Sequence, residues 1–179
     1  LLNLPALVYP VSNESTQICA ELIDWTIYEW ERQIIKREKN TIPVKKYFLK
    51  EQHPAIEEWT QAILDANIVI ICPGVLGSWI ISTLLFDWIK ESLEKTNAKL
   101  VYICNAMTFA SQTDGFTVHD HIESFEQYTG KSLDYVLACT TPPPENVLAI
   151  YEDEWSEFVQ LDSENISWSI QVIADDFLM

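Results

Sequence analysis

The sequence predicts an α/β fold: an open, mostly parallel, Rossmann-like sheet with helices on both faces. Short apolar runs at 68–72, 99–104 and 133–139 alternate with amphipathic stretches. Nearly continuous apolar strands are typical of parallel sheets, whose two faces are both covered. A length of 179 residues fits one domain, so we expect residues 1–179 to form a single α/β domain.

The first third of the chain predicts a β-hairpin excursion before the parallel sheet. Residues 16–23 and 26–30 are short and rich in β-branched or aromatic side chains, and Asp24-Trp25 joins them. Residues 44–49 alternate well enough to form another strand. A helix is expected over 54–66, because its apolar residues recur at helical spacing after Pro54.

Two further helices are expected between the apolar strands. One covers 78–95, and the other covers 118–128. Thr117 and Asp120 form a capping box at the start of the second helix, and Gly130 suits its left-handed end. The proline run 142–144 is expected to end the repeating unit, with further strands at 155–161 and 168–173.

Charge excludes several classes of partner. Eleven Lys and Arg oppose 27 Asp and Glu, a formal net charge of −16, so nucleic acid and anionic membrane surfaces are not expected partners. No apolar run approaches the roughly 20 residues of a membrane-spanning helix. The opening residues lack the basic start and apolar core of a secretory signal, so we expect a cytoplasmic protein.

The cysteines and histidines predict no metal centre. Each of the four cysteines lies in an apolar stretch, which indicates small buried hydrophobic residues and no disulfide framework. His119 and His121 are two positions apart, so a helix points them in different directions and they cannot chelate one ion. His53 precedes a proline and is expected in a loop.

The best candidate site combines two loops, 72–78 and 105–117, that follow neighbouring predicted strands. Ligands bind at the carboxyl ends of strands in open parallel sheets. Gly74 and Gly77 follow the first of these strands, and backbone N–H groups there can hold phosphate without any cation. The second loop carries many neutral donors and acceptors, which suits a sugar or phosphate. The alternative is that the glycines satisfy turns and the second loop is merely solvated. No motif identifies a nucleophile.

Three segments resemble the CofD-like family: ICPGVLG (71–77), VYICNAMT (101–108) and TDGFTVHDH (113–121). LVYPVSNES (7–15) and VIADDF (172–177) are weaker similarities. The likeness is closer to the gluconeogenesis-factor branch than to the 2-phospho-L-lactate transferases. Family members begin with a strand and a GGGTG loop that cradles nucleotide phosphates. This chain therefore resembles the C-terminal part of a larger CofD-like domain.

The resemblance implies a set of ligand-binding residues within the two loops. They are Gly74, Leu76, Asn105, Thr108, Thr113, Asp114 and Gly115. Some family positions differ here. Val75, Gly77 and Ser78 stand where the family has Ser, Tyr and Thr. Trp79 occupies a small-residue position, and 109–112 replaces the family's QPGE. These changes remove hydroxyls and a carboxylate and add bulk near the ligand.

The resemblance implies three alternative functions. The first is a regulatory protein that binds a nucleotide sugar such as UDP-N-acetylglucosamine and is linked to carbon metabolism and cell shape. The second is a 2-phospho-L-lactate transferase of deazaflavin coenzyme synthesis, in which Asp114 is the candidate catalytic residue and a divalent cation such as magnesium assists. The third is a degenerate relative that binds nothing and only forms a homo-oligomer.

Overall fold

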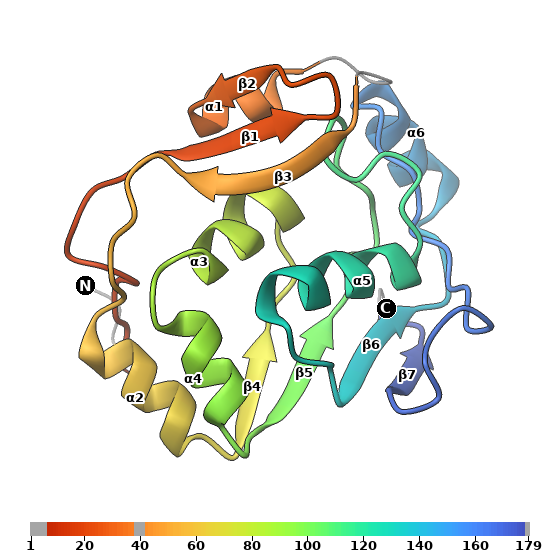
Figure 1. The fold of residues 1–179 in the computed structure, drawn as a ribbon. Helices are drawn as coiled ribbons and strands as arrows, with labels where there is room; N and C mark the ends of the chain where they lie inside the picture. Colours follow the sequence, from red (N-terminus) through yellow and green to blue (C-terminus); the bar gives the residue numbers. More distant parts are fainter. Residues whose placement is uncertain (1–6, 38–41, 178–179) are drawn as a thin grey trace.

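The computed structural model describes residues 7–37 and 42–177, which form two β-sheets and the helices around them (Figure 1). A three-stranded antiparallel sheet has the order β2-β1-β3, and a four-stranded parallel sheet has the order β4-β5-β6-β7. The predicted α/β class with a parallel sheet is therefore confirmed. In Figure 1 the small sheet lies at the top, and the arrowheads of β4 and β5 point toward it.

The small sheet contains the predicted hairpin and the strand after it. The hairpin consists of β1 (Ile18–Leu22) and β2 (Ile27–Glu29), and β3 (Val44–Leu49) pairs with the other side of β1. Trp25 adopts a positive φ in the turn, where the Asp24 carboxylate accepts a hydrogen bond from the Thr26 N–H. A short helix, α1 (Glu31–Ile35), follows β2 and was not predicted.

Most elements of the parallel unit form where they are expected. Thr117 and Asp120 make the predicted capping box, and Gly130 ends the same helix with a φ of 66°. The bounds are α2 (Glu57–Asp65), β4 (Ile68–Ile71), β5 (Lys99–Ile103), α5 (Val118–Thr129) and β6 (Tyr135–Cys139).

The single helix expected over 78–95 is wrong. The segment divides into a π-helix, η1 (Leu76–Ile81), a short α3 (Ser82–Leu84) and α4 (Ile89–Lys95). Between α3 and α4, Asp87 exchanges backbone hydrogen bonds with the 53–55 segment, and Trp88 takes a left-handed φ of 73°. Pairing with a distant segment replaces the helical hydrogen bonds that sequence periodicity predicts.

The expected end of the repeating unit at 142–144 is also wrong. Pro144 precedes a further helix, α6 (Glu145–Asp153), and β7 (Gln171–Asp175) extends the parallel sheet beside β6. A proline is well suited to the start of a helix because its missing N–H would have no helical partner. Residues 155–161 form no strand; their one bridge joins Phe158 to Met107.

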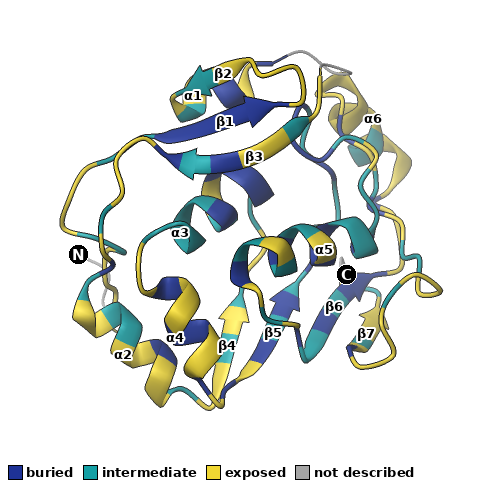
Figure 2. Ribbon diagram, viewed as in Figure 1, coloured by how far each residue is buried: buried dark blue, intermediate teal, exposed yellow. Residues whose placement is uncertain are grey.

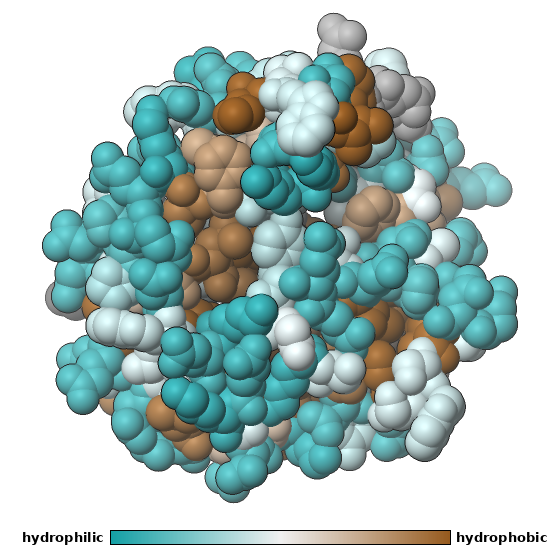
Figure 3. Space-filling view, in the orientation of Figure 1, coloured by the Kyte–Doolittle hydropathy of each residue, from teal (hydrophilic) through white to brown (hydrophobic). Residues whose placement is uncertain are grey.

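The main core lies between one face of the parallel sheet and helices α2, α4 and α5. Tyr102 of β5 stacks on Phe125 of α5, with ring centroids 6.3 Å apart. A second cluster joins the small sheet to η1 through Ile34, Leu76 and Ile81. Figure 3 shows apolar side chains gathered over α3, between the small sheet and α4, on a face that is otherwise largely hydrophilic.

Strand β4 is more exposed than its sequence predicts. Its four apolar residues predict burial on both faces, yet Ile68 and Ile70 are exposed, and Figure 2 shows β4 as exposed beside the buried positions of β5. Cys72, just after β4, is exposed as well, which corrects the expectation of four buried cysteines; Cys19, Cys104 and Cys139 are buried, and all four are free.

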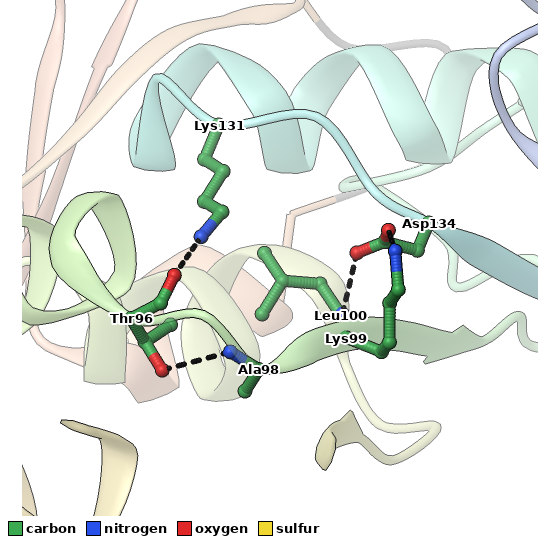
Figure 4. Close-up of polar contacts among 6 residues, drawn as sticks. All are labelled: Thr96, Ala98, Lys99, Leu100, Lys131 and Asp134. Carbon is green, nitrogen blue, oxygen red and sulfur yellow. Dashed lines mark hydrogen bonds and ion pairs between the residues drawn. The ribbon is translucent and has the colours of Figure 1, made fainter. Parts of the chain in front are cut away.

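A network of polar contacts stabilises the end of the sheet at which strands β5 and β6 begin. The Asp134 carboxylate accepts hydrogen bonds from Lys99 Nζ at 2.6 Å and from the Leu100 N–H at 2.9 Å (Figure 4). Lys131 donates to the Thr96 carbonyl at 2.7 Å, just past the end of α4. These stabilising contacts therefore lie at the amino ends of the strands, whereas loops occupy the carboxyl ends.

Within the described parts of the chain, no helix combines the length and the apolar character needed to cross a membrane.

Candidate functional site

Gly74 and Asn105 join the two candidate loops at the carboxyl ends of β4 and β5. The Asn105 side chain accepts a hydrogen bond from the Gly74 N–H at 3.0 Å and donates one to the Gly74 carbonyl at 2.8 Å. Both halves of the amide are used, so the contact fixes its orientation. The loops predicted to meet at one crevice therefore do meet.

A second pair of contacts brings in the segment before β7. The Thr108 N–H donates to the Glu157 carbonyl at 2.7 Å, and the Thr108 hydroxyl accepts from the Glu157 N–H at 2.8 Å. Thr108 is buried. These bonds hold 155–157 against the second loop, where that segment forms part of the site wall.

A third contact ties the second loop to η1. The Gln112 side-chain oxygen accepts a hydrogen bond from the Ser78 N–H at 3.0 Å. Gly77, the residue before Ser78, packs against the same side chain. A Cβ placed on Gly77 would lie 2.2 Å from Tyr47 Cζ and 2.6 Å from the Gln112 side-chain oxygen. Glycine is required at this position because Tyr47 and Gln112 approach the backbone so closely.

The loops surround a hollow of about 520 Å³, within the range of small-molecule sites. It opens between the two loops, α1 and the end of α6. The lining residues are Ile35, Pro73, Gly74, Val75, Trp79, Asn105, Ala106, Met107, Thr108, Phe109, Ala110, Tyr151, Glu154 and Ser156.

The walls of the hollow are largely apolar and aromatic. Trp79 is 58 % exposed, and its indole N–H donates to the Glu31 carboxylate, which connects η1 to α1. Ile35 and Tyr151 form other parts of the rim. An exposed indole held in place at a pocket rim can stack on a flat ring such as a nucleobase.

The lining offers little charge to an anionic ligand. Among the described residues, its only ionisable carboxylate is that of Glu154, and no Lys or Arg lines it. Magnesium prefers an octahedral set of oxygen ligands that includes one or two carboxylates. The Asp114 carboxylate accepts from the Ser111 N–H at 2.8 Å and does not line the hollow. The described residues therefore do not fit a magnesium site here.

The structure brings together some of the predicted ligand-binding residues but not others. Gly74, Asn105 and Thr108 line the hollow. Leu76 and Thr113 are buried, and the Thr113 hydroxyl accepts a hydrogen bond from the Phe109 N–H at 2.7 Å. Thr113 and Asp114 thus accept hydrogen bonds from residues of the second loop itself and stabilise its conformation.

Gly115 also lies outside the hollow. It is exposed, with a φ of 70° and no atom within 4 Å of the place a Cβ would occupy. Its conformational freedom therefore serves the turn before α5.

Neither Cys104 nor His121 offers a reactive group at the site. Burial raises the pKa of the Cys104 thiol to about 12, so it stays protonated at neutral pH. His121 is fully buried; its Nδ1 lies 2.8 Å from the Thr117 carbonyl, and burial lowers its pKa. His119, Asp120 and Glu123 have ligand atoms within 4.8 Å of one another, but Asp120 already accepts hydrogen bonds from Thr117.

Sequence reasoning missed the part of the wall that comes from outside the two loops. Ile35 lies on α1, and Tyr151 and Glu154 lie at the end of α6. The signal for α6 was present, because Pro144 and Glu145 precede apolar residues at helical spacing. Nothing in the sequence indicated that α1 would lie near the carboxyl ends of the parallel strands.

The family model described as "2-phospho-L-lactate transferase CofD" matches residues 1–178. The chain belongs to the CofD family. Curated relatives include a Thermotoga maritima protein of the gluconeogenesis-factor group, 35 % identical over the whole chain. The gluconeogenesis factors of Halalkalibacterium halodurans and Bacillus subtilis are 33 % and 32 % identical over 100 % and 99 % of this chain.

Solved structures agree with this assignment. A crystal structure of a UPF0052-family protein from Bacillus halodurans is 31 % identical, covers 95 % of this chain and 55 % of its own, and has a TM-score of 0.88. A second X-ray structure of a protein from that organism gives a TM-score of 0.92 over 99 % of this chain and 57 % of its own. The chain thus spans about half the length of the family members it matches.

Proposed function

We propose that the protein binds a nucleotide sugar of the UDP-N-acetylglucosamine type and acts as a cytoplasmic regulator of carbon metabolism and cell shape. The observation that carries this proposal is the hollow of about 520 Å³ between the loops that Gly74 and Asn105 join. Its position at the carboxyl ends of parallel strands is the usual one for nucleotide ligands in open α/β sheets.

The character of the walls supports a ligand with both a flat ring and polar groups. Trp79 provides an exposed indole for stacking, while Thr108 of the second loop and Ser156 add hydroxyl groups to the lining. Because the lining has no Lys or Arg among the described residues, phosphates here would depend on backbone N–H groups or on parts of the protein outside this chain. The free cysteines agree with a reducing compartment.

Thermal stability of the complete encoded polypeptide tests the proposal. A ligand that binds only the native state raises the melting temperature as its concentration exceeds the Kd. We expect UDP-N-acetylglucosamine at about 1 mM to raise it, and N-acetylglucosamine alone to do so far less. The absence of any shift with the nucleotide sugar contradicts the proposal and favours the non-binding relative.

Two tryptophan variants locate the binding. Trp79 and Trp88 are 58 % and 53 % exposed, but only Trp79 lines the hollow. Trp79→Ala should weaken binding about tenfold, the loss expected from one base–aromatic stack, while Trp88→Ala should leave the Kd unchanged. Equal effects of the two variants in calorimetric titrations would place the ligand elsewhere.

The description of the family model supports a second candidate, transfer of a phospholactyl-type group from a nucleotide-activated donor to a deazaflavin acceptor. The catalytic role of Asp114 stays a prediction, and Asp114 is not among the residues that line the hollow. Product formation that is abolished by Asp114→Asn would establish this alternative. No product with any such donor and acceptor would remove it.

A further inference from the structure

Helix α1 carries two basic side chains that have no partner among the described residues. Arg32 and Lys36 are both exposed, and neither forms a hydrogen bond or an ion pair with another described residue. Arg32 lies in α1, and Lys36 follows the last residue of that helix. Side chains four positions apart are neighbours on a helix surface, so the two charges lie along one side of α1.

The other basic side chains of the described residues already have partners. Lys45 and Lys46 pair with Glu21, and Lys50 pairs with Glu29. The rest are Arg37, which donates to the Ile42 carbonyl; Lys90 and Lys95, which pair with Glu94 and Glu91; Lys99, which pairs with Asp134; and Lys131, which donates to the Leu93 and Thr96 carbonyls. Arg32 and Lys36 are therefore the described cations best able to bind an anionic ligand.

Two hydrogen bonds hold α1 beside the candidate hollow. The Glu31 carboxylate accepts one from the Trp79 indole N–H, and the Ile34 carbonyl accepts one from the Ser111 hydroxyl at 3.1 Å. Trp79 lines the hollow, and Ser111 belongs to the second loop. These contacts fix the position of α1 relative to both candidate loops.

Arg32 and Lys36 flank the residue of α1 that lines the hollow. That residue is Ile35, which Lys36 follows directly and which Arg32 precedes by three positions, close to one helical turn. Neither basic residue lines the hollow itself. Both have long side chains with the charge at the end, which can reach groups of a ligand that project from the mouth of the hollow.

The lining of the hollow does not match the charge of a nucleotide sugar. Such a ligand carries a negative diphosphate between its base and its sugar. Among the described residues, the lining has no Lys or Arg and has the carboxylate of Glu154, and the net charge of the chain is −16. A diphosphate is therefore repelled by most of this surface and needs a local group of cations.

We propose that Arg32 and Lys36 bind the diphosphate of a nucleotide ligand whose base or sugar occupies the hollow. A guanidinium group can donate two parallel hydrogen bonds to a phosphate, and an ammonium group adds a compact positive charge. This assignment rests on the proposed function. It adds that residues of α1 make the site select ligands that carry a diphosphate.

A double variant of the complete encoded polypeptide, Arg32→Gln with Lys36→Gln, tests the assignment. Its Kd for UDP-N-acetylglucosamine should rise about tenfold, the combined loss of two exposed charge–phosphate contacts. The control is Lys90→Gln with Lys95→Gln, which removes the same charge from α4, away from the hollow, and should leave the Kd unchanged. Equal Kd values for the wild type and the α1 variant would overturn the assignment and leave the proposed function standing.

Salt dependence distinguishes a lost charge from a damaged hollow. Raising sodium chloride from about 50 to about 300 mM should weaken binding of UDP-N-acetylglucosamine to the wild type more than to the α1 variant, because salt screens exposed charges. Both positions are exposed, so the melting temperatures of the unliganded proteins should agree. Weaker binding by the α1 variant with an unchanged salt dependence would overturn the assignment.

Inorganic pyrophosphate tests the two cations even if UDP-N-acetylglucosamine does not bind and the proposed function fails. Pyrophosphate at about 10 mM should raise the melting temperature of the wild type above that in sodium chloride of equal ionic strength. The α1 variant should show no such rise. A rise of equal size in both proteins, or no rise in either, would overturn the role of Arg32 and Lys36.

Discussion

Asn105 and Gly74 exchange two hydrogen bonds across the carboxyl ends of β4 and β5, at 3.0 Å and 2.8 Å. A single side chain thus satisfies both the N–H and the carbonyl of a glycine in the neighbouring loop. Both residues line the hollow, so this contact links the two loops at its wall.

Removing this contact should destabilise the protein and weaken ligand binding together. Asn105→Ala leaves both polar groups of Gly74 without their partner in a partly buried position, at an expected cost of about 1–3 kcal/mol. Urea unfolding of the complete polypeptide measures it. The control is Asn165→Ala, whose side chain makes one exposed hydrogen bond, to Asp162, and which should cost less than about 1 kcal/mol. If the two variants lowered the free energy of unfolding equally, the contact between Asn105 and Gly74 would stabilise the protein no more than an exposed hydrogen bond does.

A methyl group at Gly77 should be poorly tolerated. Gly77→Ala forces Tyr47 and Gln112 away from positions 2.2 Å and 2.6 Å from the new Cβ, an overpacking cost of about 1–3 kcal/mol. Gly74→Ala is the matched control, since its nearest neighbour would be Trp79 at 3.6 Å. Differential scanning calorimetry should find a clearly lower melting temperature for the Gly77 variant only. A tolerated Gly77→Ala would mean that Tyr47 can move aside.

Asp134 should contribute to stability in a pH-dependent way. Burial opposes its ionisation, but hydrogen bonds from Lys99 and the Leu100 N–H outweigh burial and lower its pKa. The contribution is therefore complete above its unfolded pKa of about 3.9 and is lost as the pH falls through the lower folded pKa. At pH 7, Asp134→Asn should cost about 1 kcal/mol in urea unfolding.

The exposed Asp65→Asn serves as the control for Asp134, because Asp65 accepts one hydrogen bond, from Gln61. Its effect should be smaller at every pH. The difference in the free energy of unfolding between wild type and Asp134→Asn should become smaller in acid. A difference that stays constant down to pH 2 would contradict the assigned role of the Asp134 charge.

His121 should make the protein less stable in mild acid. Burial lowers its folded pKa below the unfolded value of about 6.5, so the unfolded chain takes up a proton first as the pH falls. The stability of the native state therefore declines below about pH 6.5. The melting temperature should drop less between pH 7.5 and 5.5 in His121→Gln than in the wild type. An identical drop would show that other groups cause the acid sensitivity.

Periodicity and cap chemistry predict the elements that depend on local sequence. Thr117, Asp120 and Gly130 define α5 correctly, since each acts through backbone groups a few residues away. The break before α4 could not be predicted in this way, because Asp87 pairs with a segment about thirty residues earlier. Tertiary hydrogen bonds there override the helical pattern of 78–95.

The same distinction applies to the site. The rule that ligands bind where consecutive parallel strands end predicted the two loops and needs only strand order. The family resemblance named Gly74, Asn105 and Thr108 within those loops, and all three line the hollow. Thr113 and Asp114 proved to support the loop from inside, which depends on how the loop folds on itself. Tyr151 was missed because its position depends on the packing of α6, a helix with no buried residue of its own.

A crystal structure of the complete polypeptide grown with UDP-N-acetylglucosamine tests the central claim most directly. We predict ligand density in the hollow between Gly74 and Thr108, with the uracil or sugar ring against Trp79. Density for the ligand at any other place on the protein, with this hollow filled only by solvent, would contradict the claim.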